Sequence, residues 1–70
     1  MRDYVFIRFI NEYGQSDSCE YWLDKYQVRF SMKHGLSVLV RDSNGAIWSD
    51  SERVLYIPTD KVISVITRRI

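Results

Sequence analysis

Apolar and polar residues alternate along most of this chain, and short runs of turn-forming residues separate the alternating segments. In residues 26–32, for example, Val28, Phe30 and Met32 share one face while polar side chains occupy the other. A period of two is typical of a β-strand that buries one face. The pattern predicts strands at residues 4–10, 26–32, 36–41, 46–49, 54–57 and 61–68. Residues 19–23 are too few to fix a period, so they are either a short strand or the far arm of a loop.

Turn signals connect several of these segments. Residues 33–35 end in a glycine, which supplies the positive φ that a tight reversal often needs. The pair Asn44-Gly45 is the strongest short-range signal for a hairpin, so residues 46–49 should pair with the strand before them. Residues 11–18 gather polar turn formers and form the longest predicted loop.

The apolar composition favours β-structure over helix. The chain has seven valines and seven isoleucines but only one alanine. β-Branched side chains suit a pleated surface better than a helix. With 70 residues the chain has room for one core, so we expect a single domain spanning residues 1–70. Consecutive strands with short connections predict an antiparallel meander of five or six strands. Curling this meander into a small barrel would protect its apolar face and remove exposed edges.

Part of the chain resembles an SH3 domain. In residues 30–40, an apolar residue, a basic residue and a glycine precede an alternating strand, as they do in SH3 domains. Trp48 follows a turn, where those domains carry the tryptophan that begins their peptide groove. Residues 56–62 are similar to their closing segment, in which a proline precedes a short 3-10 turn and a valine. The resemblance implies an all-β, SH3-like barrel with a binding groove near Trp48, Tyr56 and Pro58.

Two positions depart from the SH3 pattern. Lys61 stands where SH3 domains have an aromatic residue before the final valine, and Ile47 replaces the second tryptophan of the pair. A groove that binds polyproline needs parallel aromatic ridges to hold the preformed left-handed helix. The resemblance therefore supports the shape of the barrel more than it supports recognition of proline-rich motifs.

Aromatic residues near predicted turns are the first candidates for partner contacts. Tryptophan and tyrosine anchor many interfaces because each joins a large apolar area to one polar group. Trp48 and Tyr56 are such residues, and packing in the core is the alternative for them. A second group ends the polar loop, where aromatic and acidic side chains would accept a basic segment or cover one end of the barrel. The candidate partner-binding residues are thus Trp48, Tyr56, Pro58, Trp22, Tyr21, Asp17 and Glu20.

Arginines spread over several strands make nucleic acid the alternative partner. Small barrels bind single-stranded DNA or RNA by combining arginines with exposed aromatic rings. Arg29 and Arg41 are predicted to be cross-strand neighbours on an outward face, and Arg68 and Arg69 end the last strand. Acidic residues interrupt a continuous basic track, and a formal net charge of only +1 excludes a strongly basic DNA-coating protein.

Few side chains in this sequence are suited to catalysis. Cys19 and His34 are the one pair that would serve as nucleophile and base, but they fall on different predicted elements with no third orienting residue. A buried thiol and a solvent-exposed turn histidine are the simpler interpretation. One cysteine cannot form an internal disulfide, and no spacing of carboxylates marks a metal site. We therefore expect no enzyme activity, no metal and no cofactor.

These features lead to two functional hypotheses. The first is a non-enzymatic protein–protein interaction module, such as an adaptor or an inhibitor of a larger protein. The alternative is a small β-barrel that binds single-stranded DNA or RNA. The single cysteine, and the lack of an apolar stretch long enough for a membrane span or a signal peptide, predict a cytoplasmic protein without membrane contact.

The last strands are apolar at nearly every position. Residues 54–57 and 62–66 lack the charge or proline that usually deters an edge strand from pairing with another chain. One small barrel covers only one face of these strands, so the other face needs residues 4–10 or a second chain. The sequence therefore predicts a homodimer built on these strands.

Overall fold

The structure of the chain is a computed structural model that describes residues 2–48 and 51–70. Over these residues the chain forms β-strands and one short 3-10 helix, so the all-β prediction is confirmed. The elements in chain order are β1 (Asp3–Ile10), β2 (Ser16–Trp22), β3 (Tyr26–Ser31), β4 (Gly35–Val40), β5 (Arg53–Ile57), η1 (Thr59–Lys61) and β6 (Val62–Arg69). The ambiguous residues 19–23 largely belong to β2, which begins earlier than expected and shortens the predicted loop.

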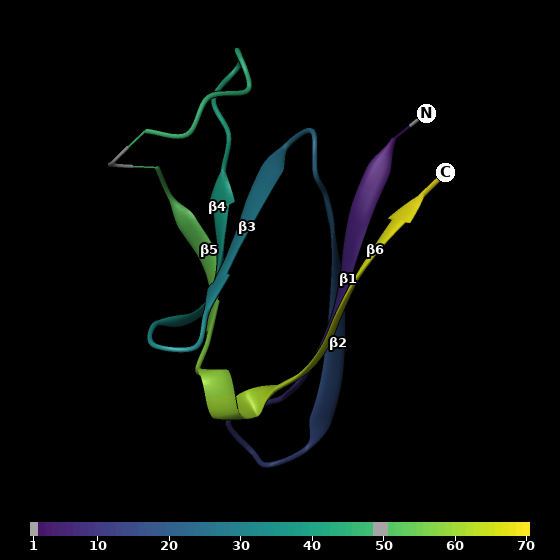
Figure 1. Cartoon of the computed structure of the whole chain (residues 1–70), viewed down its shortest axis with the longest axis vertical. Coiled ribbons are helices and arrows are strands. Elements are labelled where there is room, and N and C mark those ends of the chain that lie inside the picture. Colours follow the sequence, from purple (N-terminus) through teal and green to yellow (C-terminus); the bar gives the residue numbers. More distant parts are fainter. Residues whose placement is uncertain (1, 49–50) are drawn as a thin grey trace.

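The strands divide into two antiparallel sheets, in the orders β2-β1-β6 and β3-β4-β5. Figure 1 shows the sheets as two facing walls, joined at one end by the turn between β2 and β3 and at the other by η1. The predicted meander is interrupted in two places, because β2 does not pair with β3 and β6 returns to β1. Across the described residues the pairings give two open sheets, and no backbone ladder closes them into one ring.

The pairing of β6 with β1 brings the two ends of the chain together. Arg2 and Ile70 exchange two backbone hydrogen bonds, of 3.0 and 2.9 Å, and Figure 1 shows the ends side by side. β1 carries apolar residues on both of its faces, which suits the central strand of a sheet. β2 and β6 therefore become the outer strands of this sheet.

The core lies between the two sheets and is small. Among the described residues, five aliphatic side chains are fully buried: Val5, Ile7, Leu36, Val38 and Ile57. They come from alternate positions of β1 and β4 and from the end of β5, as a period of two requires. β1 and β4 are the central strands of their sheets, so each is flanked by a strand on both sides. The opposite sheet covers their inward side chains.

The connection between β4 and β5 differs from the prediction. Of the predicted strand at residues 46–49, Ser49 lies outside the described residues and the remainder is not a strand. Asp42 holds the connection locally, because its Oδ1 accepts hydrogen bonds from the backbone amides of Asn44 (2.8 Å) and Ala46 (2.9 Å). The Asn-Gly pair thus forms a turn within the connection, and β5 takes the place beside β4.

Gly35 lies at the start of β4, close to the end of β5, and this contact predicts an effect on stability. Its φ is +81°, and an added Cβ would lie 2.5 Å from the carbonyl oxygen of Ile57. Gly14 has a similar φ of +77° but nothing within 4 Å of that position. We predict that Gly14→Ala lowers the free energy of unfolding by about 1–2 kcal/mol, the cost of a left-handed backbone. Gly35→Ala should cost about 2 kcal/mol more, because β5 must also shift.

Urea unfolding followed by tryptophan fluorescence measures both losses of stability. The two variants change the same residue type at nearly the same φ, so their difference isolates the contact with β5. Equal losses in the two variants would contradict the importance of that contact.

Candidate functional site

An apolar groove lies where the end of β1 meets β5 and η1. We call it the Pro58 groove, and it has a volume of about 390 Å³. It is lined by residues 9–12, residues 55–58 and Lys61. Most of these side chains are apolar, while Glu12 and Lys61 supply one charge of each sign. Grooves of this size and composition are typical of binding sites for small ligands and short peptide segments.

The Pro58 groove runs along the free edge of β5. Successive side chains of a strand point to opposite faces, yet four consecutive residues, 55–58, line this groove. Consecutive residues can line one groove when the groove lies beside the edge of the strand rather than over one of its faces. β5 is the outer strand of its sheet, so one side of its backbone has no partner strand among the described residues.

Hydrogen bonds order both walls of the groove. On one side, Thr59 Oγ1 donates to the carbonyl oxygens of Ser31 (3.2 Å) and Met32 (3.0 Å), which fixes η1 against the end of β3. On the other side, Asn11 Oδ1 accepts hydrogen bonds from two backbone amides of the loop after β1, at 2.9 and 3.0 Å. The groove is therefore built by contacts within the chain.

The structure brings two of the predicted contact residues together. Tyr56 and Pro58 both line the Pro58 groove, and the Tyr56 side chain is 48% exposed. Trp48 lies instead in the β4–β5 connection, where it is 61% exposed and its Nε1 donates to Asp42. Trp48 thus occupies neither the core nor the groove, the two places that the sequence suggested for it.

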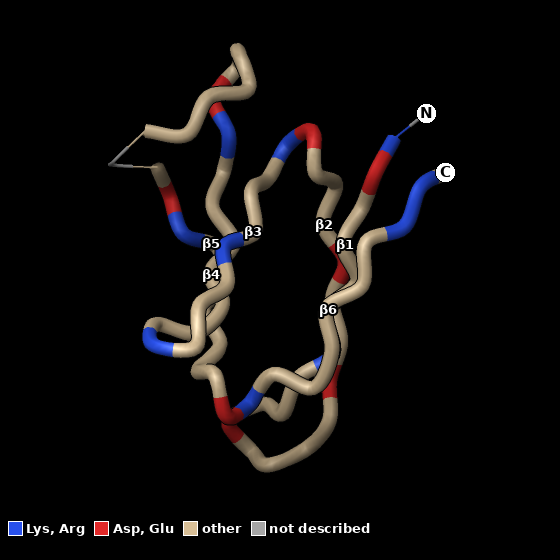
Figure 2. The backbone as a smooth tube through the Cα atoms, in the orientation of Figure 1, with Lys and Arg blue, Asp and Glu red and all other residues tan. Residues whose placement is uncertain are grey.

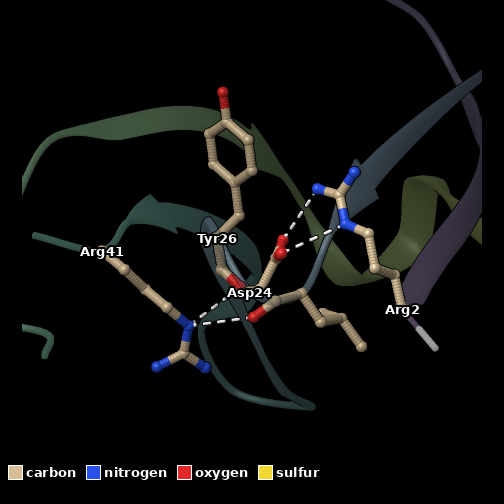
Figure 3. Close-up of polar contacts among 5 residues, drawn as sticks. Arg2, Asp24, Tyr26 and Arg41 are labelled. Atoms are coloured by element: carbon tan, nitrogen blue, oxygen red, sulfur yellow. Dashed lines mark hydrogen bonds and ion pairs between the residues drawn. The ribbon is translucent and has the colours of Figure 1, made fainter. Parts of the chain in front are cut away.

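Tyr21 and Trp22 point to opposite faces of β2. Trp22 lies on the outer face, with its ring centroid 5.7 Å from that of Tyr4 and the Arg2 guanidinium 3.8 Å from its centre. Arg2 also pairs with Asp24 at 3.1 Å (Figure 3). Tyr21 packs against the core. The two rings lie on opposite faces of β2, yet both residues line one pocket of about 210 Å³, together with Tyr4, Glu20 and Ile70.

The two acidic candidates are separated as well. Glu20 lies opposite Phe6 on the outer face of β2, and Asp17 lies opposite Phe9 near the start of that strand. Both are exposed, and neither lines the Pro58 groove. Glu20 lines the same pocket as Tyr21 and Trp22, whereas Asp17 lies apart from it near the start of β2. The predicted group of acids and aromatic rings is therefore brought together in part.

Arg41 supports the fold rather than an outward surface. Its Nε donates to the carbonyl oxygens of Leu23 (3.1 Å) and Tyr26 (3.3 Å), as Figure 3 shows. Its Nη1 donates to the carbonyl oxygen of Gly45 at 2.9 Å. The predicted pairing of Arg29 with Arg41 is wrong, because the residue opposite Arg29 on β4 is a serine.

The two arginines at the end of β6 have different surroundings. Arg69 pairs with Asp3 at 2.8 Å, and this contact raises the pKa of Arg69 and lowers the pKa of the Asp3 carboxyl. Arg68 lies on the outer face of its sheet, with its guanidinium 5.8 Å from the centre of the Phe6 ring. Asp3 therefore neutralises the charge of Arg69, and Arg68 and Arg69 do not act as one basic pair.

Three residues of the exposed surfaces are not among the contact residues that the sequence predicts. Glu12 and Lys61 line the Pro58 groove, and Lys61 appeared in the sequence only as a departure from the SH3 pattern. Arg53 begins β5, and its guanidinium lies 5.4 Å from the centre of the Tyr56 ring. Its place within a polar run gave no signal of this contact.

Cys19 and His34 lie on separate elements. Cys19 faces inward on β2 opposite Ile7, and partial burial raises the pKa of its thiol. A raised pKa disfavours the thiolate, which is the nucleophilic form of cysteine. His34 is exposed in the turn between β3 and β4. Over residues 2–48 and 51–70, no three His, Cys, Asp or Glu side chains are grouped to hold a metal ion.

Comparisons with known proteins find nothing similar to this chain: no family model, no curated protein and no solved structure matches it. Within the described part of the chain, no helix is long and apolar enough to cross a membrane. Function must therefore be inferred from the groove and the exposed surfaces.

Asp42 links the exposed Trp48 to the turn of the β4–β5 connection, and this link predicts a pH effect. The indole hydrogen bond, and then the bond from the Ala46 amide, lower the pKa of the Asp42 carboxyl. Because the folded pKa is depressed, the stabilisation is present above the unfolded pKa and is lost as the pH falls through the folded pKa. We predict that the pH-dependent change of Trp48 fluorescence in a Trp22→Phe variant has its midpoint below the ordinary pKa of aspartate.

The control for this titration is the same variant with Asp42→Asn, which keeps the shape of the side chain and removes its charge. We expect no such fluorescence change in the control. A change centred on the ordinary aspartate pKa, or one that survives Asp42→Asn, would contradict the assignment.

Proposed function

We propose that this chain is a non-enzymatic protein–protein interaction module that binds an extended segment of another protein along the free edge of β5. The observation that carries the proposal is the Pro58 groove, an apolar groove beside an unpaired strand edge. An extended peptide adds to such an edge through main-chain hydrogen bonds, and pockets for its alternate side chains give specificity.

The lining of the Pro58 groove indicates the chemistry of the partner. Phe9 and Leu55, which are only partly buried, favour apolar side chains at alternate positions of the bound segment. Glu12 favours a basic residue on the partner, and Lys61 favours an acidic one. The expected ligand is therefore an extended, mainly apolar segment that carries both charges near the groove.

An SH3-like arrangement of the two sheets is part of this proposal. The chain forms a hairpin, then a three-stranded sheet, and then a 3-10 turn before the last strand. This order of elements supports the SH3-like arrangement. The Pro58 groove also borders residues 56–62, one of the segments that carry the resemblance. With one cysteine and no internal disulfide available, we assign the protein to a reducing compartment such as the cytoplasm.

Peptides selected from a random display library on the immobilised protein test this function. We predict that the selected peptides are apolar at alternate positions and bind the Tyr56→Ser variant at least about tenfold more weakly, because a buried aromatic anchor is worth about 2 kcal/mol. Tyr13→Ser is the matched control, since Tyr13 is also exposed but does not line the groove. Fluorescence anisotropy of labelled peptides measures the affinities.

Methylated peptides test the main-chain contacts of the same complex. Methylating the amides on one edge of the bound segment should abolish binding, while methylating the intervening amides should not. Peptides that tolerate both sets of methylation, or that lose equal affinity with Tyr13→Ser, would contradict binding along β5.

We also propose that two copies of the chain associate along β6. A second groove, of about 580 Å³, is lined by Phe30, Met32, Thr59 and the consecutive residues 62–65, so it follows the free edge of β6. Met32 is 78% exposed and Ile63 is 45% exposed. A domain of 70 residues buries only about 60% of its unfolded surface, so an added apolar contact would stabilise it.

Sedimentation equilibrium at micromolar concentration tests this association. We predict that the wild type sediments as a dimer of two 8.4 kDa chains. Ile63→Lys should sediment as a monomer, because it places a charge within the contact. Ile70→Lys is the matched control, because Ile70 is exposed but lies outside the β6 groove. A wild-type mass that stays at 8.4 kDa as the protein is concentrated would contradict the dimer.

A further inference from the structure

The outer face of the β3-β4-β5 sheet carries positive charge that the Pro58 groove does not use. On β4, Leu36 and Val38 are buried, so the residues that alternate with them point outward. Across the three strands, one outward row consists of Arg29, Ser37 and Tyr56, and the next consists of Gln27, Leu39 and Arg53. These two rows contain two arginines and no acidic residue.

Both arginines of this face are positioned by neighbouring side chains. Arg29 Nε donates to Gln27 Oε1 at 3.1 Å, which leaves the terminal nitrogens of its guanidinium available. The Arg53 guanidinium lies 5.4 Å from the ring centre of Tyr56, the aromatic residue of the first row. Among the described residues, neither arginine forms an ion pair with a carboxylate. Figure 2 shows blue backbone in the middle of this sheet.

A cavity of about 320 Å³ lies between the two arginines. Its lining includes Arg29, Arg53 and His34 together with the hydroxyl-bearing Ser31 and Ser37. Within the described chain, no carboxylate lines this cavity. Arginine nitrogens and serine hydroxyls are the donors with which proteins bind phosphate oxygens. The cavity therefore has the chemistry of a phosphate site.

The outer face of the other sheet is less suited to phosphate. Arg2 pairs with Asp24 at its edge, and Glu20 lies on the face itself. Arg68 also lies on that face beside the Phe6 ring, but the residue opposite Phe6 on β2 is the acidic Glu20. The two rows of the β3-β4-β5 face place two arginines beside a half-exposed aromatic ring and contain no acidic residue. Proteins that bind single strands combine a basic surface for phosphates with aromatic rings on which bases stack.

We propose that the outer face of the β3-β4-β5 sheet binds single-stranded nucleic acid. Arg29 and Arg53 contact phosphate groups at the cavity, and Tyr56 stacks against a base. Neither contact reads a base edge, so the surface accepts single strands of DNA and RNA with little sequence preference. This binding does not rest on the proposed peptide function, although Tyr56 borders both surfaces.

Fluorescence anisotropy of labelled oligothymidylate and oligouridylate at increasing salt concentration tests the proposal. Two phosphate contacts predict a slope of about −1.4 for the logarithm of the affinity against the logarithm of the salt concentration. The Arg29→Ala, Arg53→Ala double variant should bind at least about tenfold more weakly at low salt and lose most of this slope.

The Arg8→Ala, Arg68→Ala double variant is the matched control. Both residues are exposed arginines of the other sheet, so the variant removes the same charge from a different surface. It should bind within about twofold of the wild type, because general attraction by net charge is weak here. Circular dichroism and thermal melting establish that both double variants are folded.

The Tyr56→Leu variant distinguishes nucleic acid from other polyanions. It should weaken oligonucleotide binding about tenfold, through loss of stacking, and leave the binding of inorganic polyphosphate unchanged. The proposal is overturned if oligonucleotides do not bind at low salt, or if the two arginine double variants weaken binding equally. It is also overturned if Tyr56→Leu has no effect on oligonucleotide binding, which would indicate an anion site only.

Discussion

The packing of two sheets around a very small core is the constraint on which the rest of the structure depends. Among the described residues, five aliphatic side chains are fully buried, and they come from β1, β4 and β5. This core covers the central strands β1 and β4, while β2, β3, β5 and β6 remain at sheet edges. Backbone groups along a free edge need water or a partner for their hydrogen bonds. Exposed edges are therefore where this fold is open to other molecules.

Both grooves follow from these open edges. The Pro58 groove is lined by consecutive residues of β5, and the second groove is lined by consecutive residues of β6. The two strands are separated by η1, which Thr59 anchors to the end of β3, so one fixed turn orients both edges. We propose an extended peptide for the first edge and a second copy of the chain for the other. Each occupant would supply hydrogen bonds and apolar contacts that the small core does not.

The positions of the cations, rather than their number, distinguish the surfaces of this nearly neutral chain. Arg41 ties the β4–β5 connection to three backbone carbonyl oxygens, and Arg2 and Arg69 pair with carboxylates. Arg29 and Arg53 are left on one sheet face beside Tyr56. Arg29 and Arg53 thus share a cavity that no acidic side chain of the described residues lines, although the formal net charge is only +1.

Most of the strands follow from the pattern of apolar and polar residues, because this alternation is a local property that burial of one face imposes. The segments predicted at residues 4–10, 26–32, 36–41, 54–57 and 61–68 agree with β1, β3, β4, β5 and β6 to within one residue at each end. The sequence points to Tyr56 as an aromatic residue near a turn and to Pro58 through the resemblance of residues 56–62 to an SH3 segment, and both line the Pro58 groove.

The pairing of the strands and the directions of individual side chains depend on the tertiary structure. The return of β6 to β1 and the choice of β5 as partner for β4 depend on contacts between distant segments. Arg41 turned toward backbone carbonyl oxygens, and Trp48 bound Asp42 in a connection that had been predicted as a strand. Such outcomes follow from competition among non-local hydrogen bonds and packing, which a local pattern does not contain.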